Sequence, residues 1–202
     1  MRRFRSGWMA LALLLPLLGG CGYNRIQELD EAVEQSKSNV GVQLTTRNSL
    51  IPNLVETVRG AADFERGTYT GVAQARAGLP QAEQSLQQAQ QRVNQAVQGG
   101  DVEQISQADA ELRRSIGTFI NVAVEAYPQL RATENFSALQ DQLAESENRI
   151  AVARQDYNEA VRTYNTYIRQ FPQVITARAT GAERKQPYQA PAGSETAPQV
   201  EF

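Results

Sequence analysis

The stretch FSALQDQLAESENRIAVARQDYNEAVRTYNTYIRQFPQVI, residues 136–175, decides the fold. Its apolar residues recur at steps of three and four, and Ser146 is the one polar step in the series. This spacing places them on one face of an α-helix, which at 1.5 Å per residue would span ~60 Å. The series runs through Phe136, Leu139, Leu143, Ile150, Ala153, Tyr157, Val161, Tyr164, Ile168, Phe171 and Ile175. A helix of this length must bury its apolar face against other helices, so the sequence predicts an all-α protein.

The preceding residues repeat the same periodicity in shorter runs. These runs cover residues 26–44, 51–62, 82–96 and 105–127. Their three-and-four alternation is close to a heptad repeat, which is typical of helices packed as coiled coils. The sequence therefore predicts an elongated antiparallel bundle of long helices over residues 24–178.

Helix boundaries are predicted from proline, glycine and capping residues. Pro52 is expected either to kink a helix or to lie in the first turn of a new helix that Asn48 or Ser49 caps. Asp101 stands three residues before Gln104, a capping-box spacing that predicts the start of another helix. A helix is also expected to be disturbed at Gly78 and Pro80 and to stop at Gly99-Gly100, and the next helix is expected to end or bend at Pro128.

The N-terminus has the features of an export signal. Residues 1–20 contain a positive start, MRRFR, an apolar run from Trp8 to Leu18, and two small residues before Cys21. The run is interrupted by Pro16 and is shorter than the ~20 residues of a membrane span, which disfavours an uncleaved anchor. The segment LLGGC resembles the lipobox of bacterial lipoproteins, in which the cysteine is lipidated and becomes the new N-terminus. Cys21 is therefore the predicted lipidation site, and residues 1–20 the predicted signal peptide.

Composition excludes most chemistry. The sequence has no histidine, and Cys21 is the single cysteine, so a histidine general base, a His/Cys zinc site and a thiol nucleophile are all excluded. Loss of residues 1–20 removes Arg2, Arg3 and Arg5 and changes the net charge from −2 to −5, and no basic stripe for nucleic acid is present. We predict a non-enzymatic protein without cofactor, metal site, catalytic residue or nucleic-acid partner.

Polar residues beside the apolar faces have two interpretations. The amides of Asn53, Asn148, Asn158 and Asn165 are predicted to fix the register of the helices, with ligand binding as the alternative. Tyr157 and Tyr164 occupy predicted core positions, whereas Tyr167 is the outward candidate for recognition. Acidic residues interleaved with arginines, namely Glu145, Glu147, Asp156 and Glu159, are typical of a solvated, salt-bridged surface.

Two blocks of the sequence carry a family resemblance. The segment RNSLIPNLVETVRGAADFE, residues 47–65, with VAQAR at residues 72–76, closely resembles the signature of the LemA family of bacterial envelope proteins. Residues 126–172 resemble the second LemA block, and the ending APQVEF resembles the family's terminal motif. The resemblance implies a helical bundle in the envelope, where Cys21 replaces the usual transmembrane segment with lipid. Many relatives have His-Glu where this chain has Phe64-Glu65, so a role of that histidine does not carry over.

The C-terminal residues differ from the body in composition. Residues 179–202 are rich in Ala, Gly, Pro, Gln and Glu without apolar periodicity, which predicts a flexible tail after a domain of residues 21–178. Val200 and Phe202 alternate as PDZ domains require of a terminal peptide, so a PDZ-containing protease is one candidate partner. The alternative is a frayed end without function.

The predicted function is that of a scaffold or adaptor for another, unidentified envelope protein. The chain would be anchored through lipid on Cys21, either on the outer side of the cytoplasmic membrane or in the outer membrane; Gly22 in place of Asp favours the latter. Two other classes stay open: a carboxylate-dependent hydrolase, and a small-ligand carrier with an apolar cavity between helices.

Overall fold

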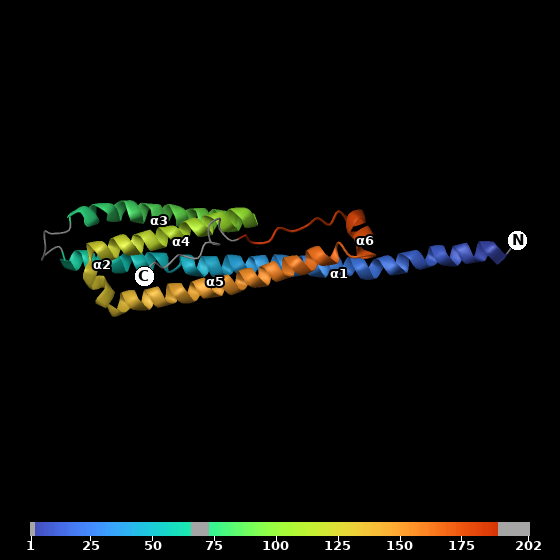
Figure 1. Ribbon diagram of the computed structural model, residues 1–202, viewed down its shortest axis with the longest axis horizontal. Coiled ribbons are helices and arrows are strands. Elements are labelled where there is room, and N and C mark those ends of the chain that lie inside the picture. Colours follow the sequence, from blue (N-terminus) through green and yellow to red (C-terminus); the bar gives the residue numbers. More distant parts are fainter. Residues whose placement is uncertain (1–2, 66–72, 190–202) are drawn as a thin grey trace, which may run out of the picture. The chain divides into compact units, whose positions relative to one another are not determined.

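The computed structural model describes residues 3–65 and 73–189, with side chains over residues 22–62 and 77–189. Within these ranges the chain is helical and has no β-strand, which confirms the predicted all-α class and helical bundle. The helices are α1 (Arg3–Asn48), α2 (Ile51–Glu65), α3 (Ala73–Gly99), α4 (Val102–Ala126), the 3-10 helix η1 (Pro128–Ala132), α5 (Glu134–Tyr167) and α6 (Gln173–Thr180) (Figure 1). None of the helices in the described ranges has a stretch long and apolar enough to cross a membrane.

The chain divides into two compact units. The first comprises residues 1–38 and 154–187, and the second comprises residues 39–153 and 188–202. Helices α1 and α5 contribute to both units, α6 belongs to the first, and α2, α3 and α4 belong to the second.

In the second unit, neighbouring helices run antiparallel. Gly41 of α1 lies beside Val97 of α3, and Asn48, seven residues later in α1, lies beside the earlier residue Asn94 of α3. The residue numbers therefore rise along α1 while they fall along the adjacent part of α3, as in antiparallel helices. Helices α3 and α4 lie side by side (Figure 1), and Arg92 pairs with Glu111 across them at 2.5 Å. The apolar stripes predicted from the sequence form the core of this unit, which includes Leu44, Ile51, Leu54, Leu86, Val93, Leu112, Phe119, Phe136 and Ile150.

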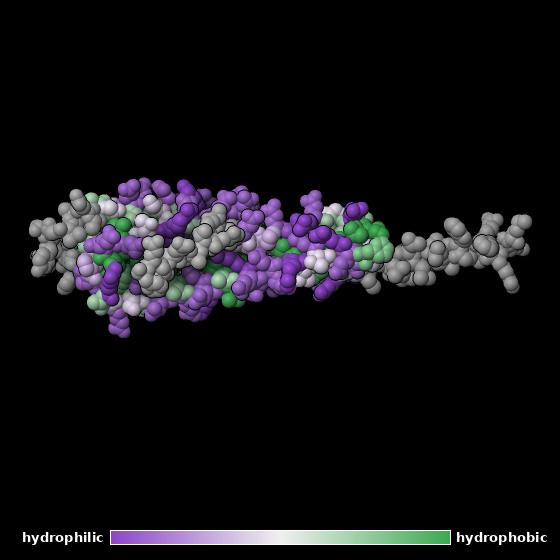
Figure 2. Space-filling model, viewed as in Figure 1, coloured by the Kyte–Doolittle hydropathy of each residue, from purple (hydrophilic) through white to green (hydrophobic). Residues whose placement is uncertain are grey.

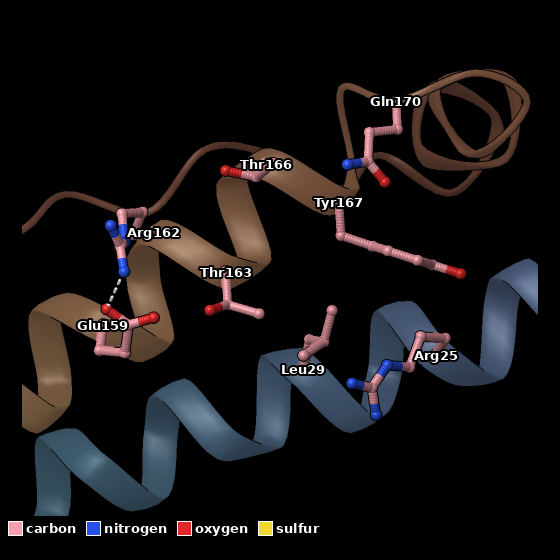
Figure 3. A pocket seen from close by; sticks show the side chains of 8 residues that line it. All are labelled: Arg25, Leu29, Glu159, Arg162, Thr163, Thr166, Tyr167 and Gln170. Carbon is pink, nitrogen blue, oxygen red and sulfur yellow. Dashed lines mark hydrogen bonds and ion pairs between the residues drawn. The ribbon is translucent and has the colours of Figure 1, made fainter.

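In the first unit, the N-terminal part of α1 packs against the C-terminal part of α5. Arg25 and Leu29 of α1 face Tyr167 and Thr163 of α5 (Figure 3). Farther along α1 lies Glu34, and burial together with the negative charge of Glu34 raises the pKa of the Tyr157 hydroxyl of α5. These two helices are therefore antiparallel as well. Their buried residues are Ile26, Leu29, Val33, Tyr157, Val161, Tyr164 and Ile168.

The predicted caps and stops set most helix boundaries. Pro52 is the second residue of α2, where its missing amide hydrogen costs no helical hydrogen bond. The Asp101 carboxylate accepts hydrogen bonds from the backbone amides of Glu103 and Gln104, at 2.9 and 3.3 Å, and so caps α4 as predicted. Gly100 follows the end of α3 with a φ of 72°, a conformation that glycine adopts without strain. Pro128 follows Tyr127, the residue that caps the C-terminal end of α4, and begins η1.

Two boundary predictions were wrong. Helix α3 continues through Pro80, which lies in its early turns, so the expected break there does not occur. The long helix predicted through Ile175 ends at Tyr167, and Phe171 and Ile175 are exposed rather than buried. Pro172 explains the second difference, because proline disfavours a helical conformation at the residue before it and lacks an amide hydrogen of its own.

Candidate functional site

A buried cluster of charges links three helices of the second unit. Arg47, at the end of α1, is completely inaccessible and donates to Asp109 of α4 at 2.6 Å and to Glu147 of α5 at 2.5 Å. Arg113, one turn after Asp109 on α4, lies 3.8 Å from Asp109 and 3.9 Å from Glu147. Two guanidinium groups thus face two carboxylates, so the cluster is close to neutral.

The geometry of this cluster favours a structural role. Asp109 is fully buried, and a buried carboxylate is tolerated only with a charged partner and hydrogen bonds. Arg47 supplies both, and its planar guanidinium reaches two carboxylates on different helices at once. We infer that the cluster fixes the alignment of α1, α4 and α5 within the second unit.

A pair of asparagines extends this polar layer toward α3. The buried Asn48 side chain donates from its amide nitrogen to Asn94 at 2.9 Å, and the Asn48 carbonyl accepts from Gln90 at 2.9 Å. Both contacts hold the turn between α1 and α2 against α3. The register-fixing role that we predicted for asparagines is thus performed here by Asn48, a residue that we considered only as a helix cap.

In the first unit, an extended segment after α6 packs against α1 and α5. This C-terminal strap, residues 182–187, belongs to the region predicted as a flexible tail, yet it makes specific contacts. The Asn165 side-chain amide donates to the Lys185 carbonyl at 2.8 Å, and the Lys185 backbone amide donates to Asn165 Oδ1 at 2.9 Å. The Tyr157 hydroxyl donates to the Gln186 carbonyl at 2.8 Å. Asn165 and Tyr157 therefore provide side-chain hydrogen bonds to the backbone of Lys185 and Gln186.

The Lys185 side chain lies between two carboxylates of α1. Its ammonium is 2.9 Å from Asp30 and 3.1 Å from Glu34, and it lies 5.9 Å from the centre of the Tyr164 ring. Burial alone would lower the pKa of Lys185, but the hydrogen bonds to Asp30 and Glu34 outweigh it and raise the pKa. The pKa of Glu34 is lowered, mainly by a hydrogen bond from Lys37 and further by Lys185. Burial raises the pKa values of Tyr157 and Tyr164.

These shifts predict that acid loosens the C-terminal strap. Glu34 has a lowered pKa in the folded state, so its contribution is present above the ordinary carboxyl pKa of about 4.3 and is lost as the pH falls through the folded value. We expect the hydrogen-exchange protection of the Lys185 amide, corrected for intrinsic pH dependence, to fall severalfold between neutral pH and the acid side of this range. The Glu34→Gln variant should lose most of this pH dependence, whereas Glu31→Gln, at an exposed position on α1, should keep it. Equal pH dependence in both variants would contradict the assignment.

A surface groove lies between α1 and α5 in the first unit (Figure 3). It has a volume of about 360 Å³, with Leu29 at its base and Thr163, Thr166 and Tyr167 on the α5 side. Its charged groups are Arg25, Glu159 and Arg162, and Gln170 lies just beyond α5. Arg162 pairs with Glu159, and Arg25 pairs with Glu28 at 2.6 Å, so the groove displays hydroxyl, amide and aromatic groups with locally balanced charge.

The structure separates the residues that we had singled out. Asn53 and Asn148 are exposed, so they do not fix helix register, whereas Asn165 binds the C-terminal strap. Tyr157 and Tyr164 are buried, as predicted, and Tyr167, which we predicted only to face outward, lines the groove. Glu145 and Glu159 pair with arginines of their own helix, in agreement with a salt-bridged surface. Glu147 differs, because it binds the buried Arg47. Cys21, Val200 and Phe202 lie outside the residues whose side chains the structure describes.

The acidic side chains of the described residues do not gather into a cluster of metal ligands. In residues 22–62 and 77–189, no group of three or more acidic, histidine or cysteine side chains comes together as metal ligands would. The two lysines of the chain both pair with carboxylates, since Lys37 binds Glu34 and Lys185 binds Asp30 and Glu34.

Comparison with known proteins shows the family. A sequence profile described as "LemA family" matches residues 36–202. The chain belongs to the LemA family. It is also similar to the magnetosome proteins MamQ 1 and MamQ 2 of Paramagnetospirillum magneticum, each 28% identical over 181 residues, and to the magnetosome protein MamQ of Magnetospirillum gryphiswaldense, 25% identical over the same length. These matches cover 85% of this chain and 66% of each relative, so the chain spans just under two thirds of their length.

The buried charge cluster connects the two LemA blocks of this chain. Arg47 is the first residue of the first block, at residues 47–65, and Glu147 lies within the second, at residues 126–172. The burial of Arg47 was not predicted, because arginine is seldom fully buried. One signal was available: Arg47 follows Leu44 by three residues and precedes Ile51 by four, so it lies on the apolar face of its helix.

Proposed function

We propose that this LemA-family chain is a lipid-anchored envelope protein that acts as a non-enzymatic scaffold or adaptor. The acyl chains on Cys21 hold it at a membrane, and the groove of Figure 3 binds a segment of another envelope protein. The observation that carries the proposal is the combination of side chains in that groove, which presents recognition groups without the elements of a reaction centre.

The groove fits a protein segment better than a small molecule. Thr163, Thr166 and Gln170 offer hydrogen-bonding groups at the surface, while Leu29 and Tyr167 offer apolar contact. A mixed surface of this kind, with an aromatic anchor and a polar rim, is typical of protein–protein contacts. Binding of an apolar small molecule would instead require a pocket lined mainly by hydrophobic side chains.

Three observations support a role without catalysis. The chain has no histidine and no cysteine apart from Cys21. The groove contains a single carboxylate, Glu159, which is paired with Arg162, whereas carboxylate-dependent hydrolases need two carboxyl groups flanking the bond to be cleaved. The relatives are named for the magnetosome and not for a reaction. Hydrolysis of peptidoglycan or phosphate esters by the purified protein, with loss of activity in Glu159→Gln, would overturn this part of the proposal.

The anchor is tested by Cys21→Ser. No other thiol can accept the diacylglyceryl group, so the variant should be neither lipidated nor cleaved, and its signal segment should be retained. Mass spectrometry and membrane fractionation of cells check both outcomes. A Cys21→Ser protein with the same mass change and membrane attachment as the wild type would contradict a lipid anchor on Cys21.

The groove is tested by crosslinking in living cells. A photoreactive residue at Thr163 should form adducts with another envelope protein, and Thr166→Trp, which fills the groove, should abolish most of them. Asn148→Trp is the matched control, because it adds the same bulk at an exposed position of α5 within the second unit. Adducts that persist in Thr166→Trp, or that disappear equally in the control, would contradict binding in the groove.

The terminal residues Val200 and Phe202 stay a separate proposal for partner binding. They lie outside the described residues, and only the alternation of these two apolar residues supports docking to an envelope PDZ protein.

A further inference from the structure

Three apolar side chains of the first unit are exposed without an evident partner. Phe171, in the turn between α5 and α6, is 82% exposed, Ile175 of α6 is 61% exposed, and Tyr23 near the lipidation site is 43% exposed. Figure 2 shows hydrophobic surface gathered over α6. Large apolar residues exposed close together usually mark a binding surface.

This apolar surface adjoins the residue that follows the lipidated cysteine. A Cβ atom on Gly22 would lie 3.6 Å from the Thr176 hydroxyl and 4.0 Å from Gln173 Cγ, so α6 packs directly beside Gly22. Thr176 follows Ile175 directly and Gln173 precedes it by two residues, and Cys21 is bonded to Gly22. The exposed side chains of α6 are therefore held close to the point where the acyl chains would enter a bilayer.

The charged residues nearby are suited to lipid headgroups. Arg169 precedes Phe171 by two residues, and Arg178 follows Ile175 by three, and both are exposed. Arginines that flank an apolar surface interact favourably with anionic headgroups while the apolar side chains enter the interface below them.

We infer that Phe171 and Ile175 form a membrane-contact patch that inserts into the lipid interface beside the acylated Cys21. The inference rests on the lipid anchor of the proposed function. With two points of contact, the acyl chains and the patch, the first unit would be held against the membrane instead of rotating freely about a single attachment.

Tryptophan fluorescence tests the patch on the full lipidated chain. The only tryptophan is Trp8, which would be removed with residues 1–20, so Phe171→Trp or Ile175→Trp would give a mature protein with a single tryptophan, which can be excited selectively over the tyrosines. The proteins are reconstituted into vesicles of phosphatidylethanolamine and phosphatidylglycerol, with and without lipids brominated near the headgroup. Val152→Trp is the control, because Val152 is a 56% exposed apolar residue of α5 in the second unit.

The patch predicts a blue-shifted emission and severalfold stronger quenching by brominated lipid for Phe171→Trp than for Val152→Trp. Equal quenching in the two proteins would overturn the inference. A blue shift without lipid quenching would also overturn it, since another protein surface would then cover the patch. Failure of the anchor gives a different result. A mature chain that lacks the added mass of acyl groups and does not float with the vesicles contradicts lipidation. A chain that floats with the vesicles but whose fluorescence is not quenched contradicts only the patch.

Discussion

Replacement of Arg47 by methionine is expected to lower the free energy of unfolding by about 3–5 kcal/mol, because it removes the guanidinium that donates a short hydrogen bond to the buried Asp109. Arg47 and Asp109 are both inaccessible to solvent, so water cannot replace the lost interaction. The effect is measured by urea denaturation of the mature chain, followed by circular dichroism. It should appear in the midpoint of the transition, with little change in its slope.

Exposed ion pairs provide the control for Arg47→Met. Arg92 pairs with Glu111 at the surface of the same unit, and Arg92→Met should change the free energy of unfolding by no more than about 1 kcal/mol. A triple variant with apolar residues at positions 47, 109 and 147 should recover much of the stability, because it removes the buried charges together with their attraction. Similar stabilities of Arg47→Met and Arg92→Met would contradict a structural role of the cluster.

The second large effect is expected from an aspartate in the core face of α5. Ile150 is completely buried, so Ile150→Asp places an unpaired carboxylate among apolar side chains and should cost several kcal/mol, on the order of 3–5. Leu143→Asp, seven residues earlier on the same face, should have a comparable effect. Thermal unfolding checks both variants.

Val152→Asp is the matched control for these substitutions. It lies two residues after Ile150 on the same helix but is 56% exposed, so it should leave the melting temperature nearly unchanged. Equal losses at Ile150 and Val152 would mean that helix propensity, and not burial, determines the result.

The helices could be predicted because their apolar periodicity is a local property of the sequence. Leu86, Val93, Leu112 and Phe119 are buried as their spacing indicates, and Asp101 caps α4 through contacts within three residues. The periodicity did not predict the end of α5. Phe171 continues the three-and-four spacing of the apolar residues of α5, but it lies beyond the end of that helix. Pro172 disfavours a helical conformation at the residue before it, so the helix does not follow the apolar pattern to its end.

The polar contacts were harder to predict because they join residues far apart in the sequence. Arg47 meets Asp109 and Glu147 only after three helices have aligned, and no local pattern pairs a particular arginine with a particular carboxylate. The contacts of residues 182–187 also could not be predicted from composition. This part of the segment that we predicted as a flexible tail is bound by the Asn165 side chain and the carboxylates of α1 through hydrogen bonds and charge.

The C-terminal strap also constrains the order of folding. Lys185 and Glu34 are 151 residues apart, so their contact closes a loop of most of the mature chain, and such closures are slow and entropically unfavourable. If the chain is exported and lipid-anchored as we propose, its N-terminus crosses the membrane first, so residues 22–38 arrive long before residues 154–187, which cover them in the first unit. The part of α1 beside the proposed anchor would then be among the first segments exported and among the last to be buried.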